Sequence, residues 1–492
     1  MLRTADTLRR AFNHLLASGV TNLYYGRGEG KFGGRDMATD FEAQASTVNA
    51  CHPPPLALRS MASYVASLVE AIYNGTARAL PVPTAQVIPQ YTCNTNTNIN
   101  ANELIWVDAS AEPEQIAVEG KGFSYAPQSD ASFWQRFPSA ANESVPSNIF
   151  RLSRSPSGVL VRFRTNASSV FVNVTRDSTY STSTFSTPTP LDQDDISTFN
   201  GREGLDAHIQ DASAVNYGKW RWIATEAATS HKEFGQMKID LPSSGPASPA
   251  DGWHNITVFL PIWVPVLSLY VGVIPSASLV ALRPYKPKAK PLYVWGSSIA
   301  QGAVVTNAGM TWPMNLQRIV DVPLLNYGFS GSCGMQLNVA EQISKASPPP
   351  LAFVMDCQPN MQSKTPDQMV NSTKAVLAQL RASLGHDCPI LVLEGHLYTN
   401  NWIKLGQQAQ QLALNAAQRS AVEAAQKAGD TKLFYLGAEG KLGDDAGVAM
   451  DSTGGIGVHP SSLAHLHMAE YIAKGLAPIL RQQRKEEERL RV

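Results

Sequence analysis

The chain has 492 residues, of which 43% are hydrophobic and 16% are charged, and its lysines and arginines balance its aspartates and glutamates. This length predicts about two domains with extensions, and the composition is typical of a well-packed globular protein. The zero net charge and the lack of a basic stripe interleaved with aromatics argue against a nucleic acid as the main partner.

The N-terminal fifth of the chain differs from the rest in its sequence pattern. Residues 1–80 predict a helical extension, with helices over 5–17 and Leu56–Asn74. Residues 81–103 are polar and rich in Asn and Thr, and they predict a linker.

The sequence leaves the cellular location unknown. The first ten residues carry three arginines without an apolar stretch, so they predict no clear secretory signal, and a weak amphipathic presequence or a plain surface helix both fit. Asn-x-Ser/Thr sequons favour the secretory pathway mildly. They occur at Asn74, Asn142, Asn166, Asn173, Asn255 and Asn371.

The cysteines argue against a structural zinc site. Cys51, Cys93, Cys333, Cys357 and Cys388 are scattered, odd in number and lack CxxC spacing. One disulfide, between Cys51 and Cys93, stays possible.

Residues 104–283 predict a β-sandwich domain of jelly-roll type, followed by a stiff linker over 284–291. Short runs rich in Val, Phe, Trp and Thr recur between turn residues. They are Val159–Arg164, Val170–Val174, Trp220–Ala224 and Ile256–Leu260. The apolar stretch Ile256–Val273 contains two prolines, so it predicts two buried strands rather than a helix inserted stably in a membrane.

Residues 292–480 predict a parallel sheet covered by helices on both faces, and 481–492 a charged, solvated tail. The expected strands are Leu292–Trp295, Val322–Asn326, Leu351–Cys357, Ile390–Glu394 and Leu433–Leu436. The expected helices cover 312–320, 336–345, 366–384, 404–428 and 461–480. In such sheets, ligands bind beyond the carboxyl ends of the strands.

Four polar or glycine positions lie at these strand ends or just before the last helix. Ser298 and Asn360 follow the first and third expected strands, Gly331 follows the second, and His459 precedes the final helix. Each position alone also fits an ordinary structural role: a helix N-cap, a tight turn or a structural loop histidine. Their shared placement makes coincidence a poor explanation.

With these residues the sequence resembles the SGNH hydrolase superfamily, also called GDSL esterases. The resemblance is closest to the branch with a Gly-Ser-Ser-Ile block, here 296–299, and it extends to the blocks Asn326–Gly331 and Asp356–Met361. That branch tends to carry a β domain ahead of the hydrolase domain. The resemblance implies a flavodoxin-like three-layer hydrolase domain and no metal or organic cofactor.

Carried over by position, the resemblance implies that Ser298 is the nucleophile and His459 its base. The backbone N–H groups of Ser298 and Gly331, with the Asn360 side chain, would form the oxyanion hole. The family usually has Asp three residues before the histidine, but this chain has Ile456 there. Asp451 across a longer loop, a Ser–His dyad oriented by a backbone carbonyl, or a decayed site all remain open.

The leading hypothesis is a serine esterase that removes short acyl groups, such as acetyl, from a carbohydrate or other small-molecule ester. Glu394, His396 and Tyr398 follow the fourth expected strand and are predicted to line the substrate pocket. A non-catalytic glycan-binding or scaffold protein and a lipid acylhydrolase are the alternatives. The oligomeric state stays open.

Overall fold

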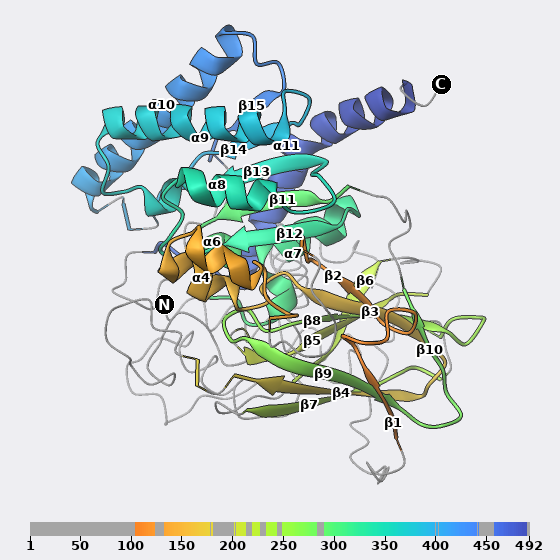
Figure 1. Cartoon of the computed structure of the whole chain (residues 1–492). Helices are drawn as coiled ribbons and strands as arrows, with labels where there is room; N and C mark the ends of the chain where they lie inside the picture. The colour runs from red at the N-terminus through yellow and green to blue at the C-terminus, as the bar shows by residue number, and fades with distance from the viewer. Residues whose placement is uncertain are drawn as a thin grey trace, which may run out of the picture. The chain divides into compact units, whose positions relative to one another are not determined.

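In a computed structural model of the chain, the described residues all belong to the compact unit Ile99–Val492 (Figure 1). The structure describes 104–489 apart from 124–131, 178, 181–200, 202, 213–218, 227–232, 244–247, 283–289, 399, 402, 440 and 442–456, and apart from the side chains of 484–489. The predicted helical extension, the linker 81–103, the Cys51–Cys93 pairing and most of the linker 284–291 therefore lie outside the described residues.

The first half of the described chain forms two antiparallel sheets. The four-stranded sheet has the order β1 (Ile105–Asp108), β9 (Val266–Val273), β4 (Ser169–Arg176), β7 (Phe234–Asp240). The other has the order β10 (Leu279–Ala281), β3 (Leu160–Thr165), β8 (His254–Phe259), β5 (Asp206–Gln210), β6 (Trp220–Thr225), with β2 (Ala117–Glu119) paired to β3.

Both sheets contribute to one hydrophobic core. Val161 and Phe163 of β3 lie in it together with Val172 and Val174 of β4, as the period-two alternation of a strand predicts. The apolar stretch after residue 255 forms β8 and β9, two strands as expected. No described helix is long and apolar enough to cross a membrane. The presence of antiparallel sheets is confirmed, and the jelly-roll topology stays a prediction.

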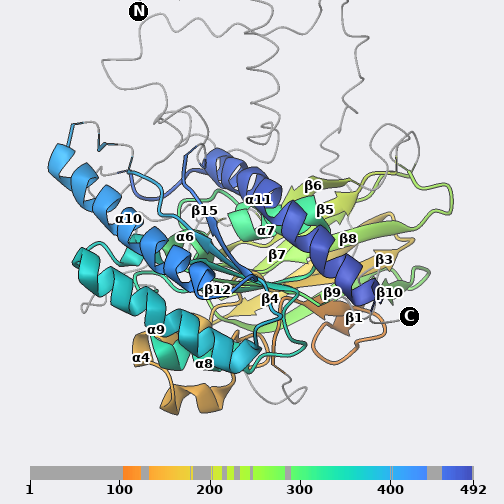
Figure 2. The same cartoon turned by 90° about the horizontal axis from the view of Figure 1, so that it is seen from above.

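A short helical segment interrupts this β-rich half, and the sequence analysis missed it. It consists of the 3-10 helix η3 (Ser139–Glu143) and of α4 (Ser147–Ser153). Helices this short show little periodicity, so the pattern gave no signal. Ile149 and Leu152 of α4 pack in the same core as Val339 of the second half, where α4 lies beside α8 (Leu337–Ser344) (Figure 2).

The second half contains the predicted parallel sheet. Its strands run in the order β12 (Leu324–Gly328), β11 (Leu292–Gly296), β13 (Ala352–Asp356), β14 (Ile390–Leu393), β15 (Leu433–Leu436). All four pairings are parallel. Counted from β11, this is the 2-1-3-4-5 order of flavodoxin-like sheets, whose switch point lies between the first and third strands.

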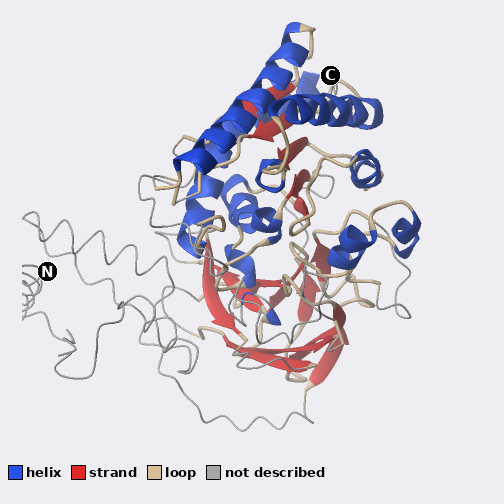
Figure 3. Cartoon of the chain, turned by 90° about the vertical axis from the view of Figure 1, so that its left-hand side faces the viewer, coloured by secondary structure: helices blue, strands red, loops and turns tan. Residues whose placement is uncertain are grey.

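Helices cover both faces of this sheet (Figure 3). Tyr293 and Trp295 of β11 pack in one core with α8, α9 (Pro366–Leu384) and α10 (Leu405–Lys427). Leu292 and Val294 pack in the other core with α6 (Ser298–Gln301), α7 (Trp312–Val320) and α11 (Ser462–Arg489). The last helix runs on to Arg489, so most of the predicted charged tail is the end of α11. Successive side chains of β11 therefore point to opposite faces of the sheet and pack against the helices on both sides.

Candidate active site

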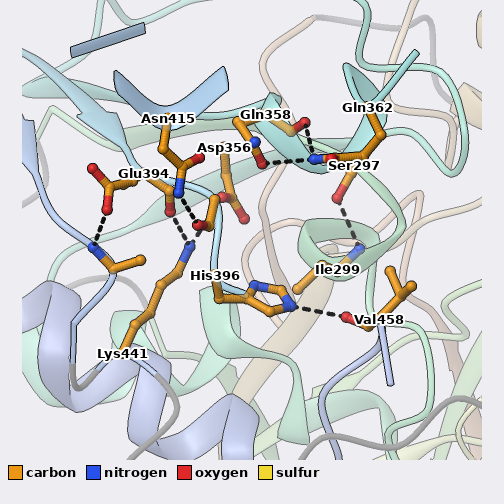
Figure 4. A network of polar contacts seen from close by, with 12 residues as sticks. Ser297, Ile299, Asp356, Gln358, Gln362, Glu394, His396, Asn415, Lys441 and Val458 are labelled. Atoms are coloured by element: carbon orange, nitrogen blue, oxygen red, sulfur yellow. Dashed lines mark hydrogen bonds and ion pairs between the residues drawn. The ribbon is translucent and has the colours of Figure 1, made fainter. Parts of the chain in front are cut away.

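Ser298 stands at the tight turn between β11 and α6. The Ser297 Oγ caps this short helix by accepting a hydrogen bond from Ile299 N at 3.3 Å (Figure 4). A Cβ on Gly296 would lie 2.5 Å from the Ala300 Cβ, so the turn requires glycine there. Ser298 is only 5% exposed, and its backbone N–H is the first of the helix, where no intrahelical acceptor exists.

His459 meets Ser298 from the segment before α11. The Ser298 Oγ and the His459 Nε2 lie 2.8 Å apart, although 161 residues separate them in sequence. At this distance a neutral imidazole can accept the serine proton directly. The structure therefore brings together the two residues that the sequence analysis expected as nucleophile and base.

The remaining position of the expected triad is outside the described residues. Asp451 and Ile456 both fall in the segment 442–456, outside the described residues. The role of Asp451 stays a prediction.

In the loop after β12, one backbone N–H has no acceptor among the described residues. Phe329 N donates to Gly296 O at 2.8 Å, Ser330 N donates to Gln301 Oε1 at 2.9 Å, and Ser332 N donates to Phe329 O at 3.1 Å. Gly331 N–H has no acceptor among the described residues. Gly331 is exposed with φ +63°, a conformation that favours glycine, and a Cβ there would meet open space.

Asn360 is oriented by its own side-chain oxygen. Its Oδ1 accepts a hydrogen bond from Cys333 N at 3.0 Å, which leaves the two protons of Nδ2 for another partner. Asn360 ends the 3-10 helix η6 (Gln358–Asn360) directly after β13. The oxyanion-hole candidates Ser298, Gly331 and Asn360 thus follow three adjacent strands, and the Asn360 side chain is tied to the loop of Gly331.

A disulfide that the sequence analysis did not predict joins the same two segments. Cys333 and Cys357 are bonded, with their Cα atoms 4.9 Å apart, and both are fully buried. Cys333 is two residues after Gly331, and Cys357 is three residues before Asn360. The only sequence signal was that Cys333 follows one expected strand of the parallel sheet and Cys357 ends another. No group of three or more His, Cys, Asp or Glu that could hold a metal occurs in the described part of the chain.

Two family models match adjacent parts of the chain. Residues 289–477 match the GDSL-like lipase/acylhydrolase family, and residues 104–279 match the N-terminal region of esterases of the SGNH-hydrolase type. The C-terminal region of the chain, residues 289–477, is a GDSL-like lipase/acylhydrolase domain. It is therefore a carboxylic ester hydrolase.

Solved structures of low identity share the fold of this acylhydrolase. A protein from Bacteroides ovatus described as a GDSL-like lipase is 22% identical, with a TM-score of 0.62. A salicylyl-acyltransferase from a tetracycline biosynthetic pathway is 16% identical, with a TM-score of 0.59. Each match covers 77% of this chain and 98% of the solved chain. No curated protein shows a significant match.

The three residues predicted to line the substrate pocket lie among other protein groups. The Glu394 carboxylate accepts hydrogen bonds from Arg419 at 2.6 Å and from the Tyr435 hydroxyl at 2.8 Å. His396 is 3% exposed, and Tyr398 is 8% exposed. A substrate contact by any of the three stays a prediction.

His396 holds the backbone next to His459. Its Nε2 lies 2.9 Å from Val458 O, the carbonyl of the residue that precedes His459 (Figure 4). Burial, together with the charge of Lys441, lowers the pKa of His396 to about 3. His396 is therefore neutral at ordinary pH, and its Nε2–H donates to Val458 O.

A buried ion pair links the ends of β13 and β14, and the sequence analysis missed it. Lys441 Nζ lies 3.2 Å from Asp356 Oδ1 and 3.2 Å from the backbone oxygen of Glu394, and the side chains of the pair are at most 2% exposed (Figure 4). Its partners lie 85 and 47 residues away, so no local pattern could reveal the pair. The pair fixes Asp356, four residues before Asn360.

Proposed function

We propose that this acylhydrolase is a serine esterase for short acyl groups, with acetyl the first choice, carried on a carbohydrate or another polyol. The observation that carries the proposal is the 2.8 Å contact between Ser298 Oγ and His459 Nε2. The N–H of Gly331 and the amide of Asn360 supply oxyanion donors beside it. The predicted domains 104–283 and 292–480 are retained in this proposal, and the boundary between the two family matches supports them.

In the first half of the reaction, the Ser298 Oγ attacks the ester carbonyl carbon while His459 Nε2 takes the serine proton. The carbonyl oxygen becomes an oxyanion that accepts hydrogen bonds from Ser298 N, Gly331 N and Asn360 Nδ2. The intermediate then collapses, the bond to the alcohol breaks, and His459 returns the proton to the departing oxygen.

In the second half, a water molecule attacks the acyl-enzyme on Ser298. His459 now takes the proton from that water, and the same three donors bind the second oxyanion. The intermediate collapses, the bond between Ser298 Oγ and the acyl carbon breaks, and His459 returns the proton to Ser298 Oγ as the carboxylic acid leaves. We propose Asp451 as the residue that orients His459, with a Ser–His dyad as the alternative.

The burial of Ser298 supports a short acyl group. The residue is 5% exposed, so a long acyl chain would need a channel built around it. The polyol part of the proposal is supported by the β-rich half, where Trp220 and Trp222 are half-buried on one face of β6. Such aromatic side chains can stack on sugar rings, although Arg162 already lies over the Trp220 ring at 5.1 Å.

The testing experiment measures acetate release from p-nitrophenyl acetate by the wild type and by Ser298→Ala. Ser298-dependent turnover is expected, followed by a sharp loss of activity as the acyl chain of the p-nitrophenyl ester is lengthened. Equal turnover in both proteins would contradict the proposal and favour the non-catalytic alternative. Sustained activity on long chains would favour the lipid acylhydrolase. Acetylated sugars then test the alcohol part of the substrate.

A further inference from the structure

We propose that the segment 132–158, chiefly through Arg136, is a positioning element for the oxyanion hole, and this rests on the proposed function. The segment lies in the N-terminal family match, outside the hydrolase match. Arg136 would act through the backbone of the loop that carries Gly331, without touching the substrate. It is therefore assigned as a positioning residue.

Arg136 is buried at the carboxyl end of β12. It is 2% exposed, and its Nη1 donates to Gly328 O at 2.6 Å and to Asn326 O at 3.2 Å. The other side of the guanidinium donates to Ser155 O at 2.9 Å and to Leu152 O at 2.7 Å. The planar fork of one arginine therefore joins the end of α4 to the strand that leads into the oxyanion loop.

The contacts continue from Arg136 to the nucleophile. Gly328 O, which Arg136 holds, belongs to the same peptide unit as Phe329 N, and this N–H donates to Gly296 O at 2.8 Å. Gly296 precedes the Ser297–Ser298 turn. The guanidinium also lies 4.8 Å from the centre of the Phe329 ring. A shift of the Gly328–Phe329 peptide would therefore move Gly331 relative to Ser298.

The same segment holds the loop at two further points. Asn148 Nδ2 donates to Ser332 Oγ at 2.9 Å, and Ser332 Oγ donates to Ser330 O at 2.9 Å. Ser157 Oγ donates at 2.6 Å to the backbone oxygen of Gln301, whose side chain accepts from Ser330 N. The peptides on both sides of Gly331 are thus fixed by contacts that start in 132–158.

The charge state suits a donor of several hydrogen bonds. Burial lowers the pKa of Arg136 to about 9, so the side chain stays protonated near neutral pH. No described carboxylate forms an ion pair with it, and every described acceptor is a backbone carbonyl or a serine hydroxyl.

The test compares Arg136→Lys with Arg176→Lys. Arg176 is a matched control because it is 1% exposed, donates to Glu203 O at 2.7 Å and pairs with Glu226, away from the oxyanion loop. Lysine keeps the charge but loses the fork. In Arg136→Lys, kcat for p-nitrophenyl acetate should fall about 10- to 100-fold with little change in KM, as expected for a misplaced catalytic group. Arg176→Lys should keep kcat per folded molecule.

Hydrogen exchange separates this inference from the proposed function, because it requires no turnover. The peptide 327–336 should exchange faster in Arg136→Lys and at the wild-type rate in Arg176→Lys. Unchanged exchange and unchanged kcat per folded molecule would overturn the inference. If the wild type has no Ser298-dependent turnover, the proposed function fails, and the exchange result alone decides whether Arg136 orders the loop.

Asn148→Ala covers the case in which Arg136→Lys does not fold. Asn148 is exposed, and among the described residues its hydrogen bond to the loop is the one to Ser332, so its loss should leave the melting temperature unchanged. Exchange of 327–336 should still rise, and kcat should fall about two- to fivefold, the equivalent of one weak neutral hydrogen bond. Wild-type values for both quantities would overturn the inference.

Discussion

Replacement of Asn360 by Asp isolates the oxyanion hole from the rest of the site. The side chain has two polar groups: Oδ1 accepts a hydrogen bond from Cys333 N at 3.0 Å, and Nδ2 is the proposed oxyanion donor. Aspartate has nearly the same shape and keeps an oxygen for Cys333 N, but it has no proton to donate at neutral pH. The variant therefore removes the proposed donor and leaves the loop contact in place.

The expected loss follows from the single donor removed. Removal of one oxyanion donor typically costs about 10²–10³ in kcat, or about 2.7–4 kcal/mol of transition-state stabilisation. The new carboxylate would also repel the oxyanion, so Asn360→Asp should lie at the larger end of this range. KM should stay close to the wild-type value because the donor acts mainly in the transition state.

Asn360→Ala separates the two functions of the side chain. It removes the donor and also the acceptor of Cys333 N, which should cost about 0.5–1.5 kcal/mol of unfolding free energy. We expect Asn360→Ala to be less stable than Asn360→Asp but more active, since it adds no charge.

The assay is steady-state hydrolysis of p-nitrophenyl acetate combined with thermal unfolding. Asn371→Asp, made in unglycosylated protein, is the control because it is the same chemical change on an exposed position of α9. It should match the wild type in both measurements. A kcat of Asn360→Asp within about threefold of the wild type would refute the assignment of Asn360 as an oxyanion donor.

Three further predictions follow from the same geometry. Ser298→Ala and His459→Ala should each reduce turnover to the background rate in a folded protein, and Asp451→Asn should reduce it only if Asp451 orients His459; circular dichroism and acetate release check this. Loss of the Cys333–Cys357 bond, which spans 24 residues, should lower the free energy of unfolding in urea by about 3 kcal/mol and should also lower kcat. The control Cys388→Ser, at a buried free thiol, should leave kcat unchanged. Burial depresses the pKa of His396 and of His465 to about 3 from an ordinary 6.5, so the stability that each neutral histidine contributes is present above about pH 6.5 and is lost as the pH falls toward 3. The melting temperature should therefore fall over this pH range, and it should fall less steeply in His465→Gln. An equal slope in the two proteins would contradict the reasoning.

The parts of the site that could be predicted from the sequence rest on local signals. Ser298, Asn360 and Gly331 each follow a run of buried apolar residues, and this placement alone identified the edge of the sheet. The helix predicted over 366–384 has its observed bounds because Thr365 and Gln368 form a capping box at its start. Such signals act within a few residues, so they do not depend on contacts with distant parts of the chain.

What the sequence could not predict depends on contacts between distant segments. Arg136 and the Gly328 carbonyl that it binds are 192 residues apart, and Lys441 and Asp356 are 85 residues apart. The same limit applies to the hydrogen-bond partners of Glu394 and His396, which lie at a strand end as ligand-binding residues do. Their side chains are directed to Arg419 and to Val458 O by packing that the sequence does not reveal.

The absence of Asp at position 456 makes the anchoring of His459 the central mechanistic question. The backbone on one side of His459 is held at Val458 O by the His396 ring, at 2.9 Å. On the other side, Ser462 Oγ accepts a hydrogen bond from Thr306 N at 2.9 Å, which fixes the start of α11. A histidine whose two flanks are fixed in this way needs less help from a carboxylate to keep its Nε2 near Ser298. Replacement of His396 should therefore harm catalysis more in this chain than in a relative with the usual Asp, because a second device for orienting the base would then be missing.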